Sequence, residues 1–248
     1  QGYQPPLYYF IAAPLGAVAQ GPLNTAPIQQ LSWWISVSTL GVGLWVGWLL
    51  FRTHLARLLL FSLTVATFPG IVYGASRISN DGLVQLWLFL GFGMLIQWWH
   101  TQRTRWWYLA AIATGLAIIT KSSGLLLVPI GAGLLWIRRP PQSFKLLAGA
   151  TAIIGAISGW LMAIRLWVDH TPSVVPNTTY LPPELHLDTS LTDLVWFNPV
   201  RLLQYPFGNR LEWLQQSQGL WEYYFRSAFF GEFPVNEALR TEGWLILL

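Results

Sequence analysis

Two short polar turns interrupt a largely apolar chain, and each carries side chains suited to binding an anion. In the second turn, Lys121 is followed by Ser122, Ser123 and Gly124. A lysine ammonium is a compact charge that attracts phosphate, and hydroxyl and backbone N–H groups at the start of a helix add hydrogen-bond donors. We therefore interpret Lys121 and Ser122 as candidate phosphate contacts. The alternative is a lysine whose ammonium extends to the lipid headgroups.

The first turn, residues 76–81, contains Arg77, Asn80 and Asp81. Arg77 is suited to holding a phosphate, while Asn80 or Asp81 would orient a sugar or an acceptor. A carboxylate is also a group that takes the proton of an acceptor hydroxyl, so Asp81 is a candidate catalytic residue. The alternative is structural: an Arg77–Asp81 pair that closes the turn and caps the next helix.

Tyr8 and Arg165 are further candidates for substrate binding. Tyr8 follows two prolines in residues 4–9, and we expect it at headgroup level, either in the site or as an aromatic anchor. Arg165 lies near the end of an apolar segment, where it either faces the same cavity as the two turns or extends to the headgroups. His170 and His186 lie near acidic residues at a spacing that matches no metal motif.

The elements that position these residues are expected to be membrane helices, because the composition excludes an ordinary soluble protein. Of the 248 residues, 54% are hydrophobic and 10% are charged, whereas a soluble domain has about 25% charged residues. The absence of Cys excludes disulfides, Cys-ligated metals and thiol nucleophiles. Residues 1–168 hold ten of the 14 basic residues and one of the ten acids. This separation fits a membrane region followed by an exported segment, and it argues against nucleic-acid binding.

We expect an all-α polytopic bundle in residues 1–168, an extracytoplasmic loop with short helices at 169–242, and the start of a further span at 243–248. A helix of roughly 20 apolar residues crosses about 30 Å of hydrocarbon. The expected spans are 28–51, 58–76, 82–99, 106–120, 124–137 and 145–168, with an outer-face interfacial helix at 5–20.

Basic residues in the connections set the expected orientation. The connections at 52–57, 100–105 and 138–145 hold seven of the ten basic residues of this region, so the positive-inside rule places them in the cytoplasm and the two polar turns outside. Residues 106–137 would also fit one long helix, but that helix would put two basic loops on opposite faces. We therefore expect a hairpin with Lys121 at its tip. The same argument favours an interfacial helix at 5–20 over a span.

The order of three segments, and the face that they share, resemble the pattern of a known family. They are Pro5-Pro6-Leu7-Tyr8-Tyr9, Arg77-Ile78-Ser79-Asn80-Asp81 and the stretch 115–124 around Thr120-Lys121. The chain is similar to the GT-C superfamily of polytopic glycosyltransferases. Its nearest resemblance is to the bacterial family 39-like enzymes, which are related to protein O-mannosyltransferases and lipid A aminoarabinose transferase. The similarity covers about residues 4–170, and residues 229–232 extend it weakly.

The resemblance implies a polyprenyl-phosphate-linked sugar donor in the lipid bilayer, at the outer face of a bacterial plasma membrane. The sugar would be transferred with inversion to an extracytoplasmic lipid, glycan or protein acceptor. Lys121 is then suggested as a contact to the lipid phosphate, and Asn80 and Asp81 as parts of the donor or acceptor pocket. No cofactor is implied, and dependence on a divalent metal stays open.

The chain departs from the family pattern at its N-terminus. The principal catalytic acid of the family lies in the first outer loop, before the Pro-Pro motif. We therefore expect the principal base upstream of residue 1, and we interpret the chain as a fragment that lacks the N-terminal span and this loop. Gln4 also stands where many relatives have His.

Two other functions fit the same pattern. A transporter or flippase for lipid-linked sugars would also need cations that face a lipid phosphate. A non-catalytic scaffold of an envelope polysaccharide assembly would not require Arg77, Asp81 and Lys121 to converge. The enzyme hypothesis predicts that Asp81, Lys121 and Tyr8 line a common cavity at the outer leaflet.

Overall fold

The computed structural model describes residues 6–18, 25–68, 71–72, 75, 78–169 and 199, without the side chains of residues 17, 18, 162, 165, 168 and 169. The chain divides into two units, Gln1–Thr67 with Gly74–Pro176, and Phe68–Tyr73 with Asn177–Leu248. The first unit contains all the helices named below. Within the described residues every regular element is a helix, which confirms the all-α class. The expected loop at 169–242 and the span at 243–248 lie outside the described residues, apart from 169 and 199.

Among the described residues, three helices are long and apolar enough to cross a membrane. They are α2 (Ala26–Phe51), α5 (Asn80–Thr101) and the Ser143–Leu161 part of α8 (Ser143–Asp169). At 1.5 Å of rise per residue, the 26 residues of α2 extend about 39 Å, which exceeds the ~30 Å of a hydrocarbon core. These helices show the composition and length of a membrane protein.

The other α-helices that the described residues form are shorter: α1 (Leu7–Val18), α3 (Leu55–Thr67), α6 (Thr104–Thr120) and α7 (Leu127–Arg138), which follows the 3₁₀ turn η1 (Ser122–Leu126). The expected helix at 58–76 is wrong in its extent, because α3 ends at Thr67. The sequence gives the reason: Pro69 has no N–H to donate, and its ring disfavours the helical conformation of the residue before it.

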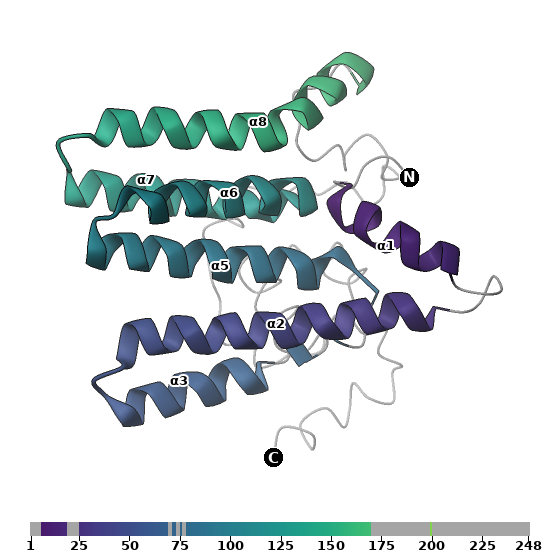
Figure 1. Ribbon diagram of the computed structural model, residues 1–248, viewed down its shortest axis with the longest axis horizontal. Coiled ribbons are helices and arrows are strands. Elements are labelled where there is room, and N and C mark those ends of the chain that lie inside the picture. Colours follow the sequence, from purple (N-terminus) through teal and green to yellow (C-terminus); the bar gives the residue numbers. More distant parts are fainter. Residues whose placement is uncertain are drawn as a thin grey trace. The chain divides into compact units, whose positions relative to one another are not determined.

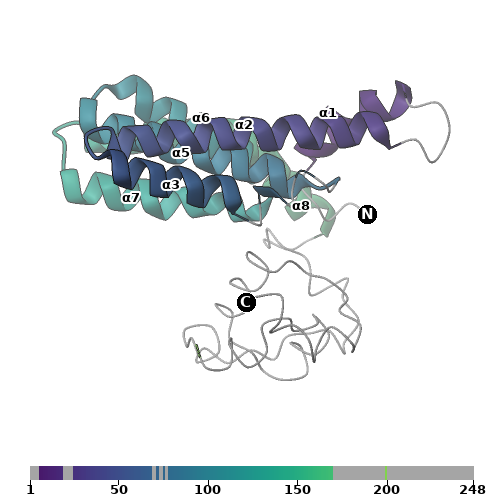
Figure 2. The ribbon, with the colours of Figure 1, turned by 90° about the horizontal axis from the view of Figure 1, so that it is seen from below.

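The helices of the first unit run back and forth along one axis (Figure 1). The turns that join α2 to α3, α5 to α6 and α7 to α8 lie together, and we call this the basic end. Figures 1 and 2 both show α1 at the opposite end, called here the α1 end. Residues 104–138 form the expected hairpin rather than one helix, because Lys121 has an extended backbone (φ −160°, ψ 146°) between α6 and η1.

The largest buried cluster joins α5, α6, α7 and α8. Its buried members are Leu95, Trp98, Trp107, Ala110, Ala111, Leu127, Leu135, Leu146 and Ala150. The rings of Trp98 and Trp107 pack with centroids 4.8 Å apart. The indole Nε1 of Trp107 donates to the carbonyl oxygen of Leu146 at 2.9 Å, so that α6 and α8 are joined by a buried hydrogen bond as well as by packing. Charges are absent from this cluster.

Candidate functional site

Two residues from the expected site meet at the α1 end of the bundle. The ammonium Nζ of Lys121 forms an ion pair with the carboxylate Oδ1 of Asp81. The two side chains are 42% and 50% exposed, respectively. The pair joins the first turn of α5 to the residue that follows α6. A cation and a carboxylate from the two separate polar turns of the sequence therefore lie side by side.

Helix ends explain why both charges are stable at these positions. Ser79 is the N-cap of α5, and its Oγ accepts the backbone N–H of Asp81 at 3.3 Å. Asp81 thus lies at the positive end of the α5 dipole, which favours a carboxylate. The N–H of Lys121 donates to the carbonyl of Ala117 at 2.8 Å, so its ammonium is attached at the negative end of α6, which favours a cation.

Asn80 holds the two helices together beneath this pair. Its side chain is buried, and Nδ2 donates to the carbonyl oxygen of Thr120 at 3.1 Å. Thr120 is itself fully buried, and its hydroxyl donates back to Leu116 at 2.7 Å. The amide nitrogen of Asn80 is therefore used within the protein. A contact between Asn80 and substrate stays a prediction.

The turn after Lys121 folds back closely onto α6. The backbone N–H of Gly124 donates to the carbonyl of Lys121 at 2.9 Å. A Cβ placed on Gly124 would lie 2.4 Å from the carbonyl carbon of Ala117 and 2.5 Å from the nitrogen of Ile118. Only glycine fits so close to a helix backbone. Gly124 therefore fixes the return of the chain, and with it the backbone from which Lys121 projects.

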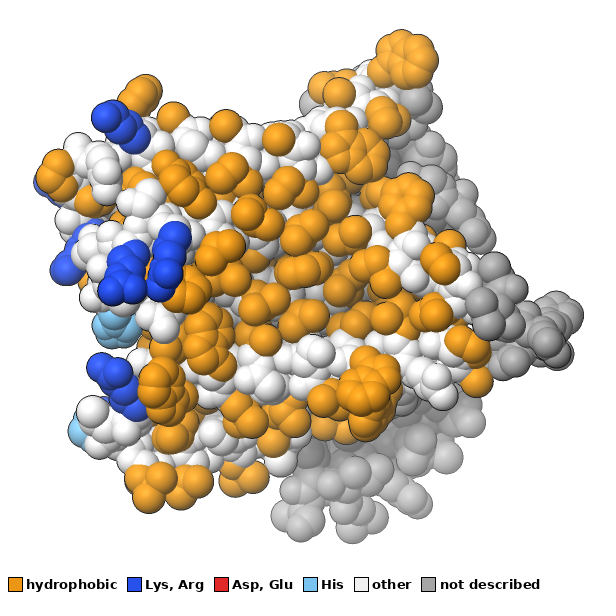
Figure 3. All heavy atoms as spheres, viewed as in Figure 1, with side chains coloured by type: hydrophobic (Ala, Val, Ile, Leu, Met, Phe, Trp, Pro, Cys, Tyr) orange, Lys and Arg blue, Asp and Glu red, His pale blue; other side chains and the backbone are white. Residues whose placement is uncertain are grey.

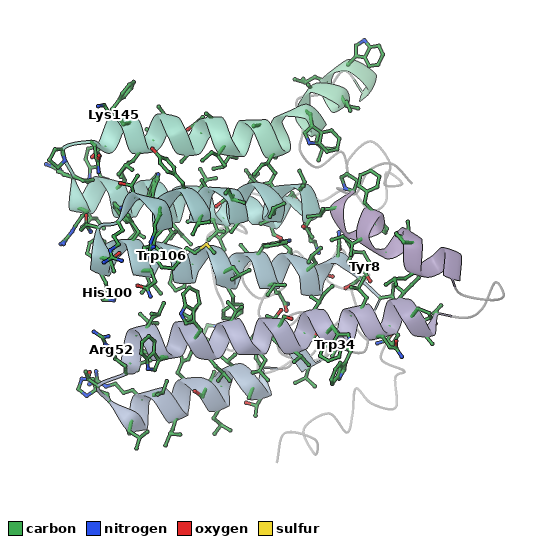
Figure 4. All side chains as sticks on the ribbon, in the orientation of Figure 1. Tyr8, Trp34, Arg52, His100, Trp106 and Lys145 are labelled. Carbon is green, nitrogen blue, oxygen red and sulfur yellow. The ribbon has the colours of Figure 1, made fainter. Side chains whose placement is uncertain are left out.

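Tyr8 is buried between helices, so it is not the exposed aromatic anchor that the sequence suggests as one alternative. Its side chain is 2% exposed, and its hydroxyl forms a 3.2 Å hydrogen bond with Ser32 on α2 rather than with either member of the ion pair. The ring packs in a cluster with Ala12, Ile35 and Leu83. Figure 4 shows Tyr8 between α1 and the neighbouring helices. Its neighbour Tyr9, with 49% exposure, is the outward-facing tyrosine.

Tyr8 nevertheless connects α1 to the helix that carries Asp81. Leu83, in the same cluster, lies two residues beyond Asp81 on α5. The burial arises because α1 lies across the ends of its neighbours, so that one side of this short helix is covered while Tyr9, Phe10 and Ile11 stay exposed. Tyr8 therefore acts in the structure as the packing contact between α1, α2 and α5.

The remaining expected site residues are only partly described. Ser122 is the first residue of η1 and is half-buried next to Lys121. Arg165 lies in α8, but its side chain is outside the described residues, and Arg77, Gln4, His170 and His186 are outside them altogether. The part of the chain that the structure describes contains no group of three metal-ligating side chains.

Sequence reasoning missed the residues that hold the site in place. Ser79 was not singled out as the cap of α5, although a serine just before an apolar helix is a usual N-cap signal. No sequence pattern predicts the hydrogen bonds of Tyr8 with Ser32 and of Asn80 with Thr120, because these bonds link positions 24 and 40 residues apart.

Comparisons of the chain with protein-family models, with curated proteins and with solved structures found no match.

Proposed function

We propose that this chain is part of a membrane glycosyltransferase of the GT-C type. The enzyme would transfer a sugar from a polyprenyl-phosphate donor to an extracytoplasmic lipid, glycan or protein acceptor. The single observation that carries the proposal is the Lys121–Asp81 pair. Its two residues come from the two polar turns that the family resemblance points to, and they meet at the end of the bundle away from the basic turns.

The two charges of the pair suit two parts of the transfer reaction. The leaving group is a phosphate, so a cation close to it stabilises the charge that develops as the bond to the anomeric carbon breaks. Lys121 is half-exposed and paired with one carboxylate. An incoming phosphate would compete with that carboxylate for the ammonium group. Asp81, once released, orients the sugar or takes up the acceptor proton.

The arrangement of the helices supports the proposed membrane placement. The three basic connections lie at one end, which under the positive-inside rule is cytoplasmic. The Lys121–Asp81 pair then faces the outside of a bacterial plasma membrane. With 12 residues, α1 is about 18 Å long, too short to cross the hydrocarbon, and its exposed face of Tyr9, Phe10 and Ile11 suits an interfacial helix.

The decisive experiment is a transfer assay on the full-length protein with polyprenyl-phosphate sugars. We expect Lys121→Ala and Asp81→Asn each to lower kcat/KM by about 10²-fold or more, the usual loss when one charge-stabilising group is removed. Arg57→Gln is the matched control, because Arg57 is an exposed cation on α3 in the basic end. Unchanged turnover in both site variants would contradict the proposal.

The same preparation separates the enzyme from the transporter. Reconstituted in vesicles, a flippase would move the lipid-linked sugar between leaflets without forming a transfer product. If the lipid-linked sugar moves between leaflets in a way that depends on Lys121, and no transfer product forms, the function is transport and not glycosyl transfer.

A further inference from the structure

A second concentration of charge lies at the basic end, far from the Lys121–Asp81 pair. It consists of seven exposed side chains: Arg52, Arg57, Arg103, Arg105, Arg138, Arg139 and Lys145. Figure 3 shows Lys and Arg gathered along the edge where the turns of the basic end lie, next to a broad apolar surface. Figure 4 shows Arg52, His100, Trp106 and Lys145 at this end, and Tyr8 and Trp34 away from it.

These cations have no acidic partner in the part of the chain that the structure describes. The acids there are Asp81 and Asp169. Asp81 is in the first turn of the 22-residue α5, and Asp169 is the last residue of the 27-residue α8. At 1.5 Å of rise per residue, the backbone of each of these residues lies about 30 Å or more along its helix from the basic end, well beyond a Debye length of about 8 Å. The charge must therefore be balanced from outside these helices.

Tryptophan rings hold several of these guanidinium groups. Arg105 lies over the ring of Trp106, with its Cζ 5.0 Å from the ring centroid, and Arg138 lies over Trp99 at 5.1 Å. The second contact crosses from α7 to α5. Both rings pack against the same buried cluster, so two guanidinium groups from different helices each lie over a ring that is attached to that cluster.

We propose that Arg105 on Trp106 and Arg138 on Trp99 bind phosphate groups of anionic phospholipid headgroups at this end of the bundle. A guanidinium stacked on a ring keeps its in-plane N–H groups, which bind phosphate oxygens in pairs. The site lies where the apolar surface of α5 and α6 ends, which is the depth of a headgroup, and tryptophan favours that depth. The surplus of cations selects an anionic lipid over a zwitterionic one.

This inference rests on the proposed membrane placement and is independent of glycosyl transfer. It is tested on the full-length protein in detergent, by native mass spectrometry with phosphatidylglycerol and phosphatidylcholine as the probes. We expect tighter binding of phosphatidylglycerol. The double variant Arg105→Gln with Arg138→Gln should weaken it by about fivefold per cation, which corresponds to about 1 kcal/mol for each charge near an anionic headgroup.

Matched variants separate this site from a diffuse charge effect. Arg57→Gln removes a cation of the same end that makes no ring contact within the described residues, and it should weaken binding clearly less than the loss of either stacked arginine. The double variant Arg105→Lys with Arg138→Lys keeps the charge and loses the planar fork, so it should weaken binding less than the double variant with Gln.

Three results would overturn the proposal. They are equal affinity for the two lipids, an equal loss in Arg57→Gln, and displacement of the lipid by inorganic phosphate at the same concentration, which would indicate a site for a soluble anion. Thermal unfolding of each variant shows that the comparison is made on folded protein. Because no transfer product is measured, the result is independent of the activity assay.

Discussion

Gly124 is the position where one added methyl group should do the most damage near the candidate site. The turn after Lys121 returns so close to α6 that a Cβ on residue 124 would meet the backbone of Ala117 at 2.4 Å and that of Ile118 at 2.5 Å. Carbon atoms in van der Waals contact are about 3.5–4.0 Å apart. Both obstacles are backbone atoms inside a helix, so no side chain can rotate away to make room. The Gly124→Ala variant must therefore move the turn by about 1 Å.

The expected loss of stability follows from that overlap. Overpacking by one methyl group typically costs about 1–3 kcal/mol, and the absence of a flexible neighbour puts Gly124 at the upper end. Alanine also restricts the unfolded chain, which offsets about 0.4–1 kcal/mol. We expect a net destabilisation of about 2 kcal/mol, and displacement of the backbone from which Lys121 reaches Asp81.

Gly133 provides the matched control. It lies in α7 on the same hairpin, and a Cβ there would have nothing within 4 Å. Because alanine is favoured over glycine inside a helix, Gly133→Ala should stabilise by about 0.5–1 kcal/mol. The two variants should thus differ by roughly 3 kcal/mol, or about 6–12 °C in Tm for a protein of this size. Thermal unfolding in detergent, followed by tryptophan fluorescence, measures this difference. Equal Tm values would refute the close approach of the turn to α6.

Two hydrogen bonds between helices make further predictions. Asn80→Ala removes the donor to the buried carbonyl of Thr120, and should lower stability by about 1 kcal/mol, within the range for such bonds in membrane proteins; an unchanged Tm would contradict the contact. Trp107→Phe removes the 2.9 Å bond to Leu146 and part of a buried ring. It should lower Tm clearly more than Trp167→Phe, whose ring is 80% exposed, and equal Tm values would contradict the bond between α6 and α8.

The sequence predicts where the helices of this chain lie better than it predicts which face of each helix is buried. Basic residues clustered in every second connection were sufficient to predict the hairpin at Lys121, because a single helix would have separated those charges. The helix expected at 58–76 extends past the end of α3 at Thr67, because the apolar composition continues beyond Pro69 although a proline disfavours the helix. Composition therefore locates apolar segments, whereas backbone chemistry determines where each helix stops.

The sequence contains little information about which face of each helix is buried, and the candidate site depends on those faces. A helix that is apolar on all sides has no contrast between its buried and exposed surfaces. Tyr8 and Tyr9 illustrate this: they are adjacent and identical, yet one is 2% and the other 49% exposed. The meeting of Lys121 with Asp81 is better anticipated, because unlike charges in two turns at the same end of a bundle attract each other across a short distance.

The ion pair itself should contribute little to folding, and this makes the site variants informative. Both partners are about half exposed, and exposed pairs contribute about 0–1 kcal/mol. The helix ends that carry them are held instead by the Ser79 cap, the Asn80 bond and the close return at Gly124. Asp81→Asn and Lys121→Ala should therefore each keep Tm within a few degrees of the wild type. A large fall in Tm for either variant would show that the pair holds the helices together, and a loss of transfer in that variant would then reflect unfolding rather than chemistry.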